Sequence, residues 1–252
     1  VFLNVTLDPA LTYGAYAVGD SNPDLMDLYE LVKKDGQSFL ERCRILFHGD
    51  GAAIPSGNDR PRYEHLRDVF NAKKIDPALD AVGIGRSEMF VYLNRHCFNG
   101  LCRYNSKGKF NVPFGRYKGP SVPHDDILLF HKQIQSVTFT AGDYTKMLAT
   151  LNPGDGDVVY LDPPYVPLSA TASFTDYSND GGFPMAKQEE LAKLAEKYSA
   201  QGAVVLVSNH DTTVSRDLYK NASSIHAFEV TRFISAAGKS RNKAPELIAV
   251  YK

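Results

Sequence analysis

The sequence has 252 residues, a formal net charge of −1 at pH 7 and a hydrophobic share of 43%, which indicates a globular protein of one large domain or two small ones. It contains no secretory signal and no long apolar run, so we expect neither export nor a membrane span. Its three cysteines lack metal-type spacing, which predicts free thiols and a cytoplasmic location.

In chain order, the first predicted unit is a strand over residues 16–20 followed by a helix. Asn22 can cap this helix, Pro23 suits its first position, and Gly36 would lie just beyond its end. A strand that ends in a carboxylate before a helix forms the second half of a nucleotide-binding unit, in which the acid binds ribose hydroxyls. Asp20 is therefore a candidate cofactor ligand, although acids at strand ends are common.

The following stretch carries apolar side chains at helical spacing, interrupted by a glycine-containing loop at 49–58. We expect a small helical bundle that includes helices over 62–74 and 77–95. Gly83 and Gly85 do not follow a predicted strand, so this pair is not read as a phosphate-binding loop.

The segment 95–118 differs in kind, because it combines basic and aromatic residues without one acidic residue. Lys107 and Gly108 predict the turn of a hairpin between 101–106 and 109–113, and such a ribbon can enter a major groove. A solvated basic face is the usual alternative for a run of charges. The interleaved rings and asparagines favour a nucleic-acid-binding surface instead.

A short apolar run at 158–161 delivers Asp162, Pro163, Pro164 and Tyr165 to one point. It predicts a buried strand of a parallel sheet, covered on both faces, with Asp162 at the carboxyl end, where ligands collect. The prolines cannot continue a ladder, so we expect their carbonyls to stay free as acceptors. Asp162 and the Pro163 carbonyl can each accept one N–H of an exocyclic amino group while Tyr165 stacks on the heterocycle.

The other elements of this half alternate between helix and strand. Asp143 can cap one of these helices. We expect helices over 125–135, 145–151 and 187–200, and strands over 137–140, 203–207, 226–233 and 247–251.

Ser208, His210 and Asp211 have the residue types of a hydrolase triad. Neighbouring residues at a strand end point to different sides, however, and no Gly-x-Ser-x-Gly elbow is present. We therefore expect Asn209 and Asp211 to cap a helix that starts near Val214.

The tetrapeptide at 162–165 resembles the catalytic motif of the amino-methyltransferases, which transfer a methyl group from S-adenosylmethionine (AdoMet) to adenine N6 or cytosine N4. Asn-Arg-His-Cys-Phe-Asn-Gly-Leu-Cys-Arg-Tyr-Asn at 94–105 and Phe-Asn-Val-Pro-Phe-Gly-Arg-Tyr-Lys at 110–118 resemble the target-recognition region of the Dam-type DNA adenine methyltransferases, which act on GATC. The resemblance runs from Val1 to Lys252.

It implies an α/β fold, namely a Rossmann-like sheet of an AdoMet-dependent methyltransferase with an inserted helical and β-hairpin DNA-recognition domain. The catalytic domain would comprise residues 1–34 and 121–252, and the recognition domain residues 35–120. Double-stranded DNA is the implied partner. We expect a monomer that needs no metal, because no His, Cys and carboxylate cluster has ligand spacing.

The resemblance also implies a role for each matching residue. Phe98 would enter the base stack beside a flipped adenine, Asn99 would contact the orphaned thymine, and Arg103 would read a guanine. The further DNA contacts would be Leu101 and Pro113 to thymine methyls, Arg116 as a phosphate or base-pair clamp, Tyr104 and Asn105 to the DNA backbone, and Arg95, Tyr117 and Lys118. The AdoMet contacts would be Asp20, Asp143, Tyr144 and Asp162, and the catalytic residues Asp162, Pro163, Pro164 and Tyr165.

One part of the family pattern is not found in this sequence. The family has a glycine-rich Phe-x-Gly-x-Gly loop after its first strand, and Val1 to Asn4 resembles the helix that follows this loop. On this reading the sequence lacks the N-terminal portion of the family, and we expect weaker cofactor binding. Two alternatives stay open, a GATC-binding protein without activity and an amino-methyltransferase that acts on another nucleic acid.

Overall fold

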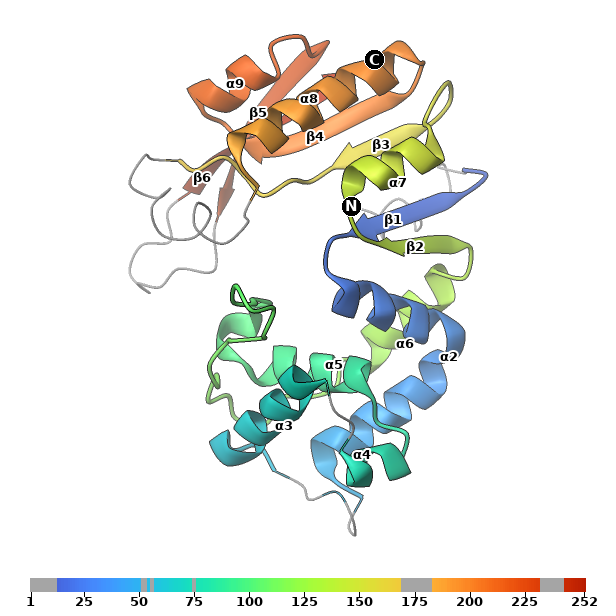
Figure 1. Cartoon of the computed structure of the whole chain (residues 1–252), viewed down its shortest axis with the longest axis vertical. Helices are drawn as coiled ribbons and strands as arrows, with labels where there is room; N and C mark the ends of the chain where they lie inside the picture. Colours follow the sequence, from blue (N-terminus) through green and yellow to red (C-terminus); the bar gives the residue numbers. More distant parts are fainter. Residues whose placement is uncertain (1–12, 51–53, 55–56, 74–75, 169–182, 232–242) are drawn as a thin grey trace. The chain divides into compact units, whose positions relative to one another are not determined.

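The computed structural model describes residues 13–50, 54, 57–73, 76–168, 183–231 and 243–252. The chain forms two compact units, residues 1–147 and 148–252, and each is described by itself. Figure 1 labels the helices and strands. No helix in the described ranges is long and apolar enough to cross a membrane.

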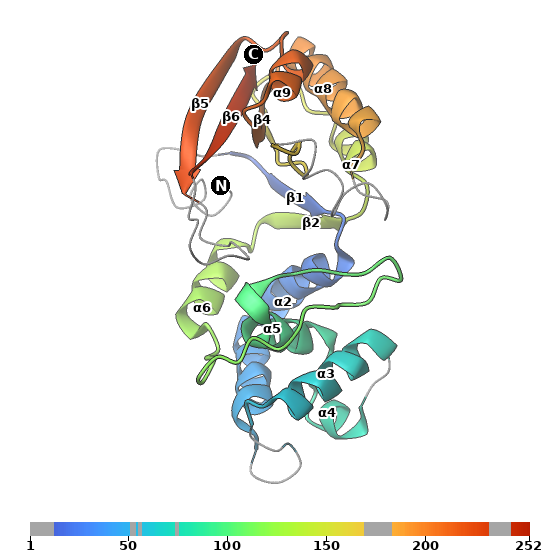
Figure 2. The ribbon, with the colours of Figure 1, turned by 90° about the vertical axis from the view of Figure 1, so that its left-hand side faces the viewer.

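The first unit combines a parallel pair of strands with a bundle of helices (Figure 2). Its sheet pairs β1 with β2 in parallel, and Asp20 lies opposite Ala141. The strand expected over 16–20 is confirmed. The elements are β1 (Tyr16–Asp20), α2 (Pro23–His48), α3 (Arg60–Ala72), α4 (Pro77–Ala81), α5 (Arg86–His96), the 3-10 turn η1 (Phe98–Gly100), α6 (His124–Gln133), β2 (Val137–Ala141) and α7 (Tyr144–Leu151), which runs into the second unit.

Helix α2 begins as predicted, because the Asn22 side chain accepts a hydrogen bond from the Asp24 amide and Pro23 follows the cap. The predicted end just before Gly36 is confirmed, because regular helical geometry is interrupted there. The helix kinks at Asp35, whose φ and ψ are −155° and 72°, and then continues to His48. Gly36 permits the close approach of α6, since a Cβ at this position would lie 2.6 Å from His131 Cγ.

The single helix expected over 77–95 is instead two helices, α4 and α5. Gly83 adopts a φ of +70° between them, a backbone conformation that residues other than glycine rarely adopt. Glycine therefore interrupts an apolar pattern that is otherwise continuous, and the two short helices pack their buried residues into one core. That core includes Tyr63, Phe70, Phe90, Tyr92 and Phe110.

The second unit is a four-stranded sheet in the order β3-β4-β6-β5. β3 and β4 are parallel, whereas β6 runs antiparallel to both β4 and β5. Helix α8 packs on β4. The elements are β3 (Val158–Leu161), α8 (Met185–Ala200), β4 (Val204–His210), α9 (Thr213–Leu218), β5 (Ser224–Thr231) and β6 (Lys243–Tyr251).

Strand β3 is the strand expected over 158–161. Among the described residues it pairs in parallel with β4. β4 extends to His210, three residues beyond the predicted end. Because Leu161 pairs with Val207, Asp162 at the end of β3 comes next to Ser208 of β4.

Candidate active site and DNA-binding surface

The catalytic loop, residues 162–166, follows β3 directly. Asp162 is exposed, and its Oδ1 accepts a hydrogen bond of 2.6 Å from the hydroxyl of Ser208. No described residue is bonded to the second carboxylate oxygen, Oδ2, or to the Pro163 carbonyl. Asp162 Oδ2 can therefore accept a hydrogen bond from a ligand, while the Pro163 carbonyl is a further acceptor on a buried residue.

Tyr165 lies beside Asp162 in the same loop. Its ring packs edge to face against His210, with centroids 5.0 Å apart. Burial raises the pKa of Tyr165 to about 12, as does the Asp162 carboxylate, while a hydrogen bond with Ser208 lowers it. The phenol stays neutral at physiological pH, which suits a ring that stacks on a base.

Two buried amides hold the rest of the catalytic loop. Asn209 Oδ1 accepts the Val166 amide at 2.8 Å, and Gln188 Nε2 donates to the Pro164 carbonyl at 2.7 Å. The two side chains are linked, because Asn209 Nδ2 donates to Gln188 Oε1. The expectation that both proline carbonyls stay free is thus wrong for Pro164.

The contacts of β4 also exclude a hydrolase triad. His210 Nδ1 donates to the Val166 carbonyl at 2.6 Å, and Asp211 is paired with Arg216 through both carboxylate oxygens. Asn209 and Asp211 were expected to cap α9, but they do not. Its cap is Thr212, whose side chain accepts from the Ser215 amide.

The two acids expected at the cofactor, Asp20 and Asp143, lie at the carboxyl ends of β1 and β2. The Gly142 amide donates to the Asp20 carbonyl at 3.0 Å, which places the turn before Asp143 beside the end of β1. Asp20 Oδ1 accepts the Asn22 amide, and Asp143 Oδ1 accepts the amide of Thr145 at the start of α7. Asp143 therefore is a helix cap, as the sequence predicted.

The residues present fit the adenosine part of AdoMet, because two exposed carboxylates stand at the carboxyl ends of neighbouring parallel strands. Asp20 retains Oδ2, for which no described residue provides a partner. Asp20 is thus suited to accept a hydrogen bond from a hydroxyl group. Tyr144 adds a half-buried ring next to Asp143.

The recognition ribbon, residues 101–113, has the predicted turn at Lys107 and Gly108. Gly108 has a φ of +67°, and Tyr104 pairs with Phe110 as an isolated antiparallel bridge. Asn105 shapes the turn, because its Oδ1 accepts the amides of Lys107 and Lys109. A hairpin is confirmed, although hydrogen bonds of regular strands do not extend along it.

Exposed side chains gather at the ribbon and its flanks. Phe98 is 45% and Tyr117 is 42% exposed, and the Tyr117 hydroxyl accepts the Asn99 amide at 2.8 Å. Gly115 lies close to the end of α5, since a Cβ there would be 2.5 Å from the Cys97 carbonyl. Most of the residues expected to contact DNA are exposed, namely Arg95, Phe98, Arg103, Asn105, Pro113, Arg116, Tyr117 and Lys118, while Asn99, Leu101 and Tyr104 are half-buried.

Arg103, the expected guanine reader, lies across the ribbon. Its Nε donates to Asn111 Oδ1 at 2.9 Å, and its Nη2 lies 3.3 Å from the Asn111 carbonyl. Asn111 thus orients the guanidinium, a role that the sequence pattern did not reveal. Arg95 is also partly engaged, because its Nε donates to the Ser121 carbonyl at 3.2 Å.

A buried carboxylate, Asp24, connects the ribbon with the helices. Arg86 donates to both of its oxygens, at 2.5 and 2.9 Å, and the Tyr104 hydroxyl donates to Oδ2 at 2.7 Å. Burial raises the pKa of Asp24, but the hydrogen bonds from Arg86 and Tyr104 outweigh it and hold the pKa below its ordinary value. The hydroxyl of Tyr104 is therefore bonded inside the unit, and its contact with the DNA backbone stays a prediction.

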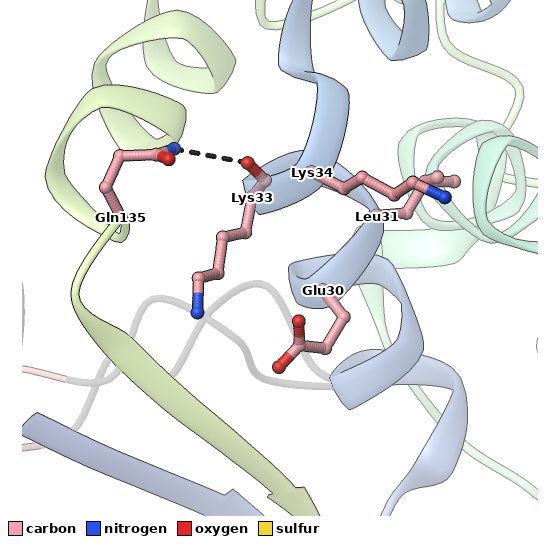
Figure 3. A pocket seen from close by; sticks show the side chains of 5 residues that line it. All are labelled: Glu30, Leu31, Lys33, Lys34 and Gln135. Carbon is pink, nitrogen blue, oxygen red and sulfur yellow. Dashed lines mark hydrogen bonds between the residues drawn. The ribbon is translucent and has the colours of Figure 1, made fainter.

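A hollow of about 600 Å³ in the first unit is lined by Glu30, Leu31, Lys33, Lys34 and Gln135 (Figure 3). Gln135 Nε2 donates to the Lys33 carbonyl, and Lys33 Nζ donates to the Val137 carbonyl at 2.7 Å. None of these residues belongs to the expected sites. Within the described ranges, no group of three or more His, Cys, Asp or Glu could hold a metal ion, and the three cysteines are free thiols, as predicted.

Known proteins resemble the chain over its whole length. Residues 1–234 match the family described as D12 class N6 adenine-specific DNA methyltransferase. The chain is 41% identical over 253 residues to a DNA adenine methylase of Serratia marcescens, covering 100% of this chain and 85% of that protein. It is 40% identical over 252 residues to the DNA adenine methylases of Escherichia coli K12 and Vibrio cholerae O1, covering 100% of this chain and 82% and 83% of those proteins.

Proposed function

The chain belongs to the D12 class of N6 adenine-specific DNA methyltransferases, and we propose that it methylates the adenine of GATC in duplex DNA after flipping this base out of the helix. As a member of this class it acts on DNA and takes its methyl group from AdoMet. The observation that carries the target sequence is the exposed ribbon with Arg103 at a position matching the guanine reader of GATC-specific enzymes.

Recognition would depend on the ribbon and its flanks. Arg103 can bind guanine O6 and N7 once it leaves Asn111, and such a bidentate contact contributes ~1–3 kcal/mol of discrimination. Base flipping costs a few kcal/mol. Stacking of Phe98 beside the gap and of Tyr165 on the extruded adenine would return about 1–3 kcal/mol for each ring, so the two terms can balance.

Catalysis would consist of positioning and lone-pair orientation. Asp162 Oδ2 and the Pro163 carbonyl would accept the two N–H groups of the adenine amino group, with Tyr165 on the ring face. When bound, AdoMet supplies an electrophilic methyl group for direct in-line transfer to N6. Asp162 serves as a hydrogen-bond acceptor more than as a strong base, and a preorganised acceptor of this kind needs no covalent enzyme intermediate.

Further parts of the proposal follow from the same family resemblance. Asp20, Asp143, Tyr144 and Asp162 would contact AdoMet, and no metal would take part. Residues 1–34 and 121–252 would form the catalytic domain and residues 35–120 the recognition domain. We propose a monomer that acts on DNA in the cytoplasm of a prokaryotic or phage-infected cell.

The test is transfer of labelled methyl from AdoMet into two duplexes that differ only in GATC versus GTAC. Incorporation confined to the GATC duplex is the expected result. Equal incorporation into both would overturn the proposed target sequence in favour of another nucleic-acid target. Selective binding of the GATC duplex without any incorporation would overturn the proposed methyl transfer by this chain. DNA binding would then be its function.

A further inference from the structure

Ser208 is a buried polar residue with no part in the family motif described above. It is 3% exposed, and its hydroxyl lies 2.6 Å from Asp162 Oδ1 and 3.3 Å from the Leu161 carbonyl. The shorter distance identifies the carboxylate as the main acceptor. Ser208 therefore occupies one oxygen of Asp162, and within the described ranges the other oxygen has no partner.

We propose that Ser208, Gln188 and Asn209 are positioning residues for methyl transfer, a role that rests on the proposed function. Ser208 orients the Asp162 carboxylate so that Oδ2 is the oxygen offered to the adenine amino group. Gln188 and Asn209 fix the loop that follows. None of the three touches the substrate, and each acts through the catalytic loop.

The catalytic loop needs such support because its own backbone cannot supply it. Pro163 and Pro164 have no N–H, so the loop cannot continue the pairing of β3 with β4. Its hydrogen bonds run instead to side chains. The Pro164 carbonyl accepts from Gln188, the Val166 amide donates to Asn209, and the Val166 carbonyl accepts from His210.

The two amides form a network in which each polar atom of Asn209 has a partner. Asn209 Oδ1 accepts the amides of Val166 and His210, and its Nδ2 donates to Gln188 and to the Tyr219 hydroxyl at 2.9 Å. Asn209 is 0% and Gln188 is 3% exposed. A buried network that is fully satisfied specifies one conformation, because any other leaves polar groups without partners.

The geometry of β4 lets consecutive residues serve both sides of the strand. Side chains alternate along a strand. Ser208 and His210 bond only to the catalytic loop among these partners, while Asn209 bonds to Val166 of the loop and also to Gln188 of α8 and to Tyr219. This arrangement gives the run Ser208-Asn209-His210 a function that differs from the hydrolase triad its residue types suggest.

The first experiment compares Ser208→Ala with Ser223→Ala in the full chain. Ser223 is a matched control, because its hydroxyl bonds the Lys252 carbonyl at 3.0 Å and it does not contact the catalytic loop. The substrate is a long unmethylated duplex that contains adenine in all sequence contexts, so the result does not depend on GATC. We measure kcat, the KM for AdoMet, the Kd for DNA and the fluorescence of 2-aminopurine placed where the parent methylates an adenine.

We expect kcat of Ser208→Ala to fall by about 10- to 100-fold, the loss of one hydrogen bond to a charged group. KM, Kd and the flipping signal should change by about twofold at most, because substrate binding does not use Ser208. Ser208→Thr, which retains the hydroxyl, should recover part of the lost kcat. Ser223→Ala should match the parent.

The second experiment removes the amide of Gln188 by Gln188→Met, which keeps the length of the side chain. Gln201→Met is the control, since Gln201 is exposed and bonds Asn152. We expect kcat of Gln188→Met to fall about tenfold. The melting temperature of the control, Gln201→Met, should be unchanged. A larger fall of kcat in Gln188→Met than in Ser208→Ala would also support the proposal, because both residues position the catalytic loop.

The outcomes separate this inference from the proposed function. An active parent with Ser208→Ala and Gln188→Met both within about twofold of its kcat would overturn the positioning role alone. Equal losses of kcat and DNA binding would also overturn it, because they indicate general unfolding. A parent that transfers no methyl group to any duplex would overturn the proposed function, together with the role that rests on it.

Discussion

The recognition ribbon and the catalytic loop are irregular segments held by different kinds of polar contact. The ribbon is tied to its helices by an ionised group, Asp24, which binds Arg86 and Tyr104. The catalytic loop is tied to β4 and α8 by neutral amides of Asn209 and Gln188. A charged hub responds to pH and to loss of either partner, whereas a neutral network depends on geometry alone.

The ribbon and the groups that hold the catalytic loop also differ in exposure. Arg103 and most of the other side chains expected to meet DNA stand on the surface of the first unit, and Arg103 is held there by its hydrogen bonds with Asn111. The groups that fix the catalytic loop are almost fully buried. Binding residues can thus change without loss of the fold, while changes in the network beneath Asp162 should affect the reaction.

The largest expected effect is that of Asp162→Ala on methyl transfer. Removal of the acceptor should lower kcat by about 10³-fold, the upper end for loss of one preorganised polar group. DNA binding should remain, because Asp162 is an exposed loop residue outside the ribbon. Transfer assays and a binding titration on the same sample check this, and activity equal to that of the parent would contradict the mechanism.

The next effect concerns the charged hub. Asp24→Ala leaves Arg86 without its carboxylate and should lower the free energy of unfolding by about 3 kcal/mol, since one partner of a buried pair is removed. Asp211→Ala is the matched control, because Asp211 pairs with Arg216 at the surface, and should cost less than about 1 kcal/mol. Denaturant unfolding measures both, and equal costs would show that Asp24 is no hub.

Low pH should lower the folding stability of the unit that carries the recognition ribbon, through His96. Burial lowers the pKa of His96 to about 4, although its hydrogen bond to the Tyr92 carbonyl opposes this shift and Arg62 and Arg95 add to it. The unfolded chain binds a proton near pH 6.5 and the folded chain does not, so stability falls as the pH drops from 7 to 5, by about 2 kcal/mol.

Unfolding measured at pH 7 and pH 5 tests this prediction. His96→Phe retains the ring that stacks on Tyr92 at a centroid distance of 3.7 Å but cannot titrate, so its stability should change less between the two pH values. The same pH dependence in the variant and the parent would assign the effect to other groups.

The smallest effect expected is on sequence discrimination. Arg103→Ala should reduce the preference for the guanine by about 1 kcal/mol, or roughly fivefold, the lower end for a bidentate contact. The value is low because Arg103 must first leave Asn111. Competition between duplexes that differ at this guanine measures it, and an unchanged preference would move the reading role to another residue.

Several features of the protein followed from the sequence because they depend on local chemistry. Asn22 and Asp143 cap helices as predicted, and Gly108 forms the predicted turn, since caps and turns are set by neighbouring residues. The order of strand, acid and helix around Asp20 was also predicted. The family of the chain could be inferred from motifs of adjacent residues, which a sequence displays directly.

Tertiary structure decided what depends on residues distant in the chain. Gly36 leaves room for His131 of α6, a residue far along the chain, because it has no Cβ. Tyr104 turned inward to Asp24, which lies 80 residues away. Likewise, Ser208 and Asn209 support a loop that precedes them by more than 40 residues. Local propensity does not encode such contacts, because they form only when the strand register and helix packing bring the partners together.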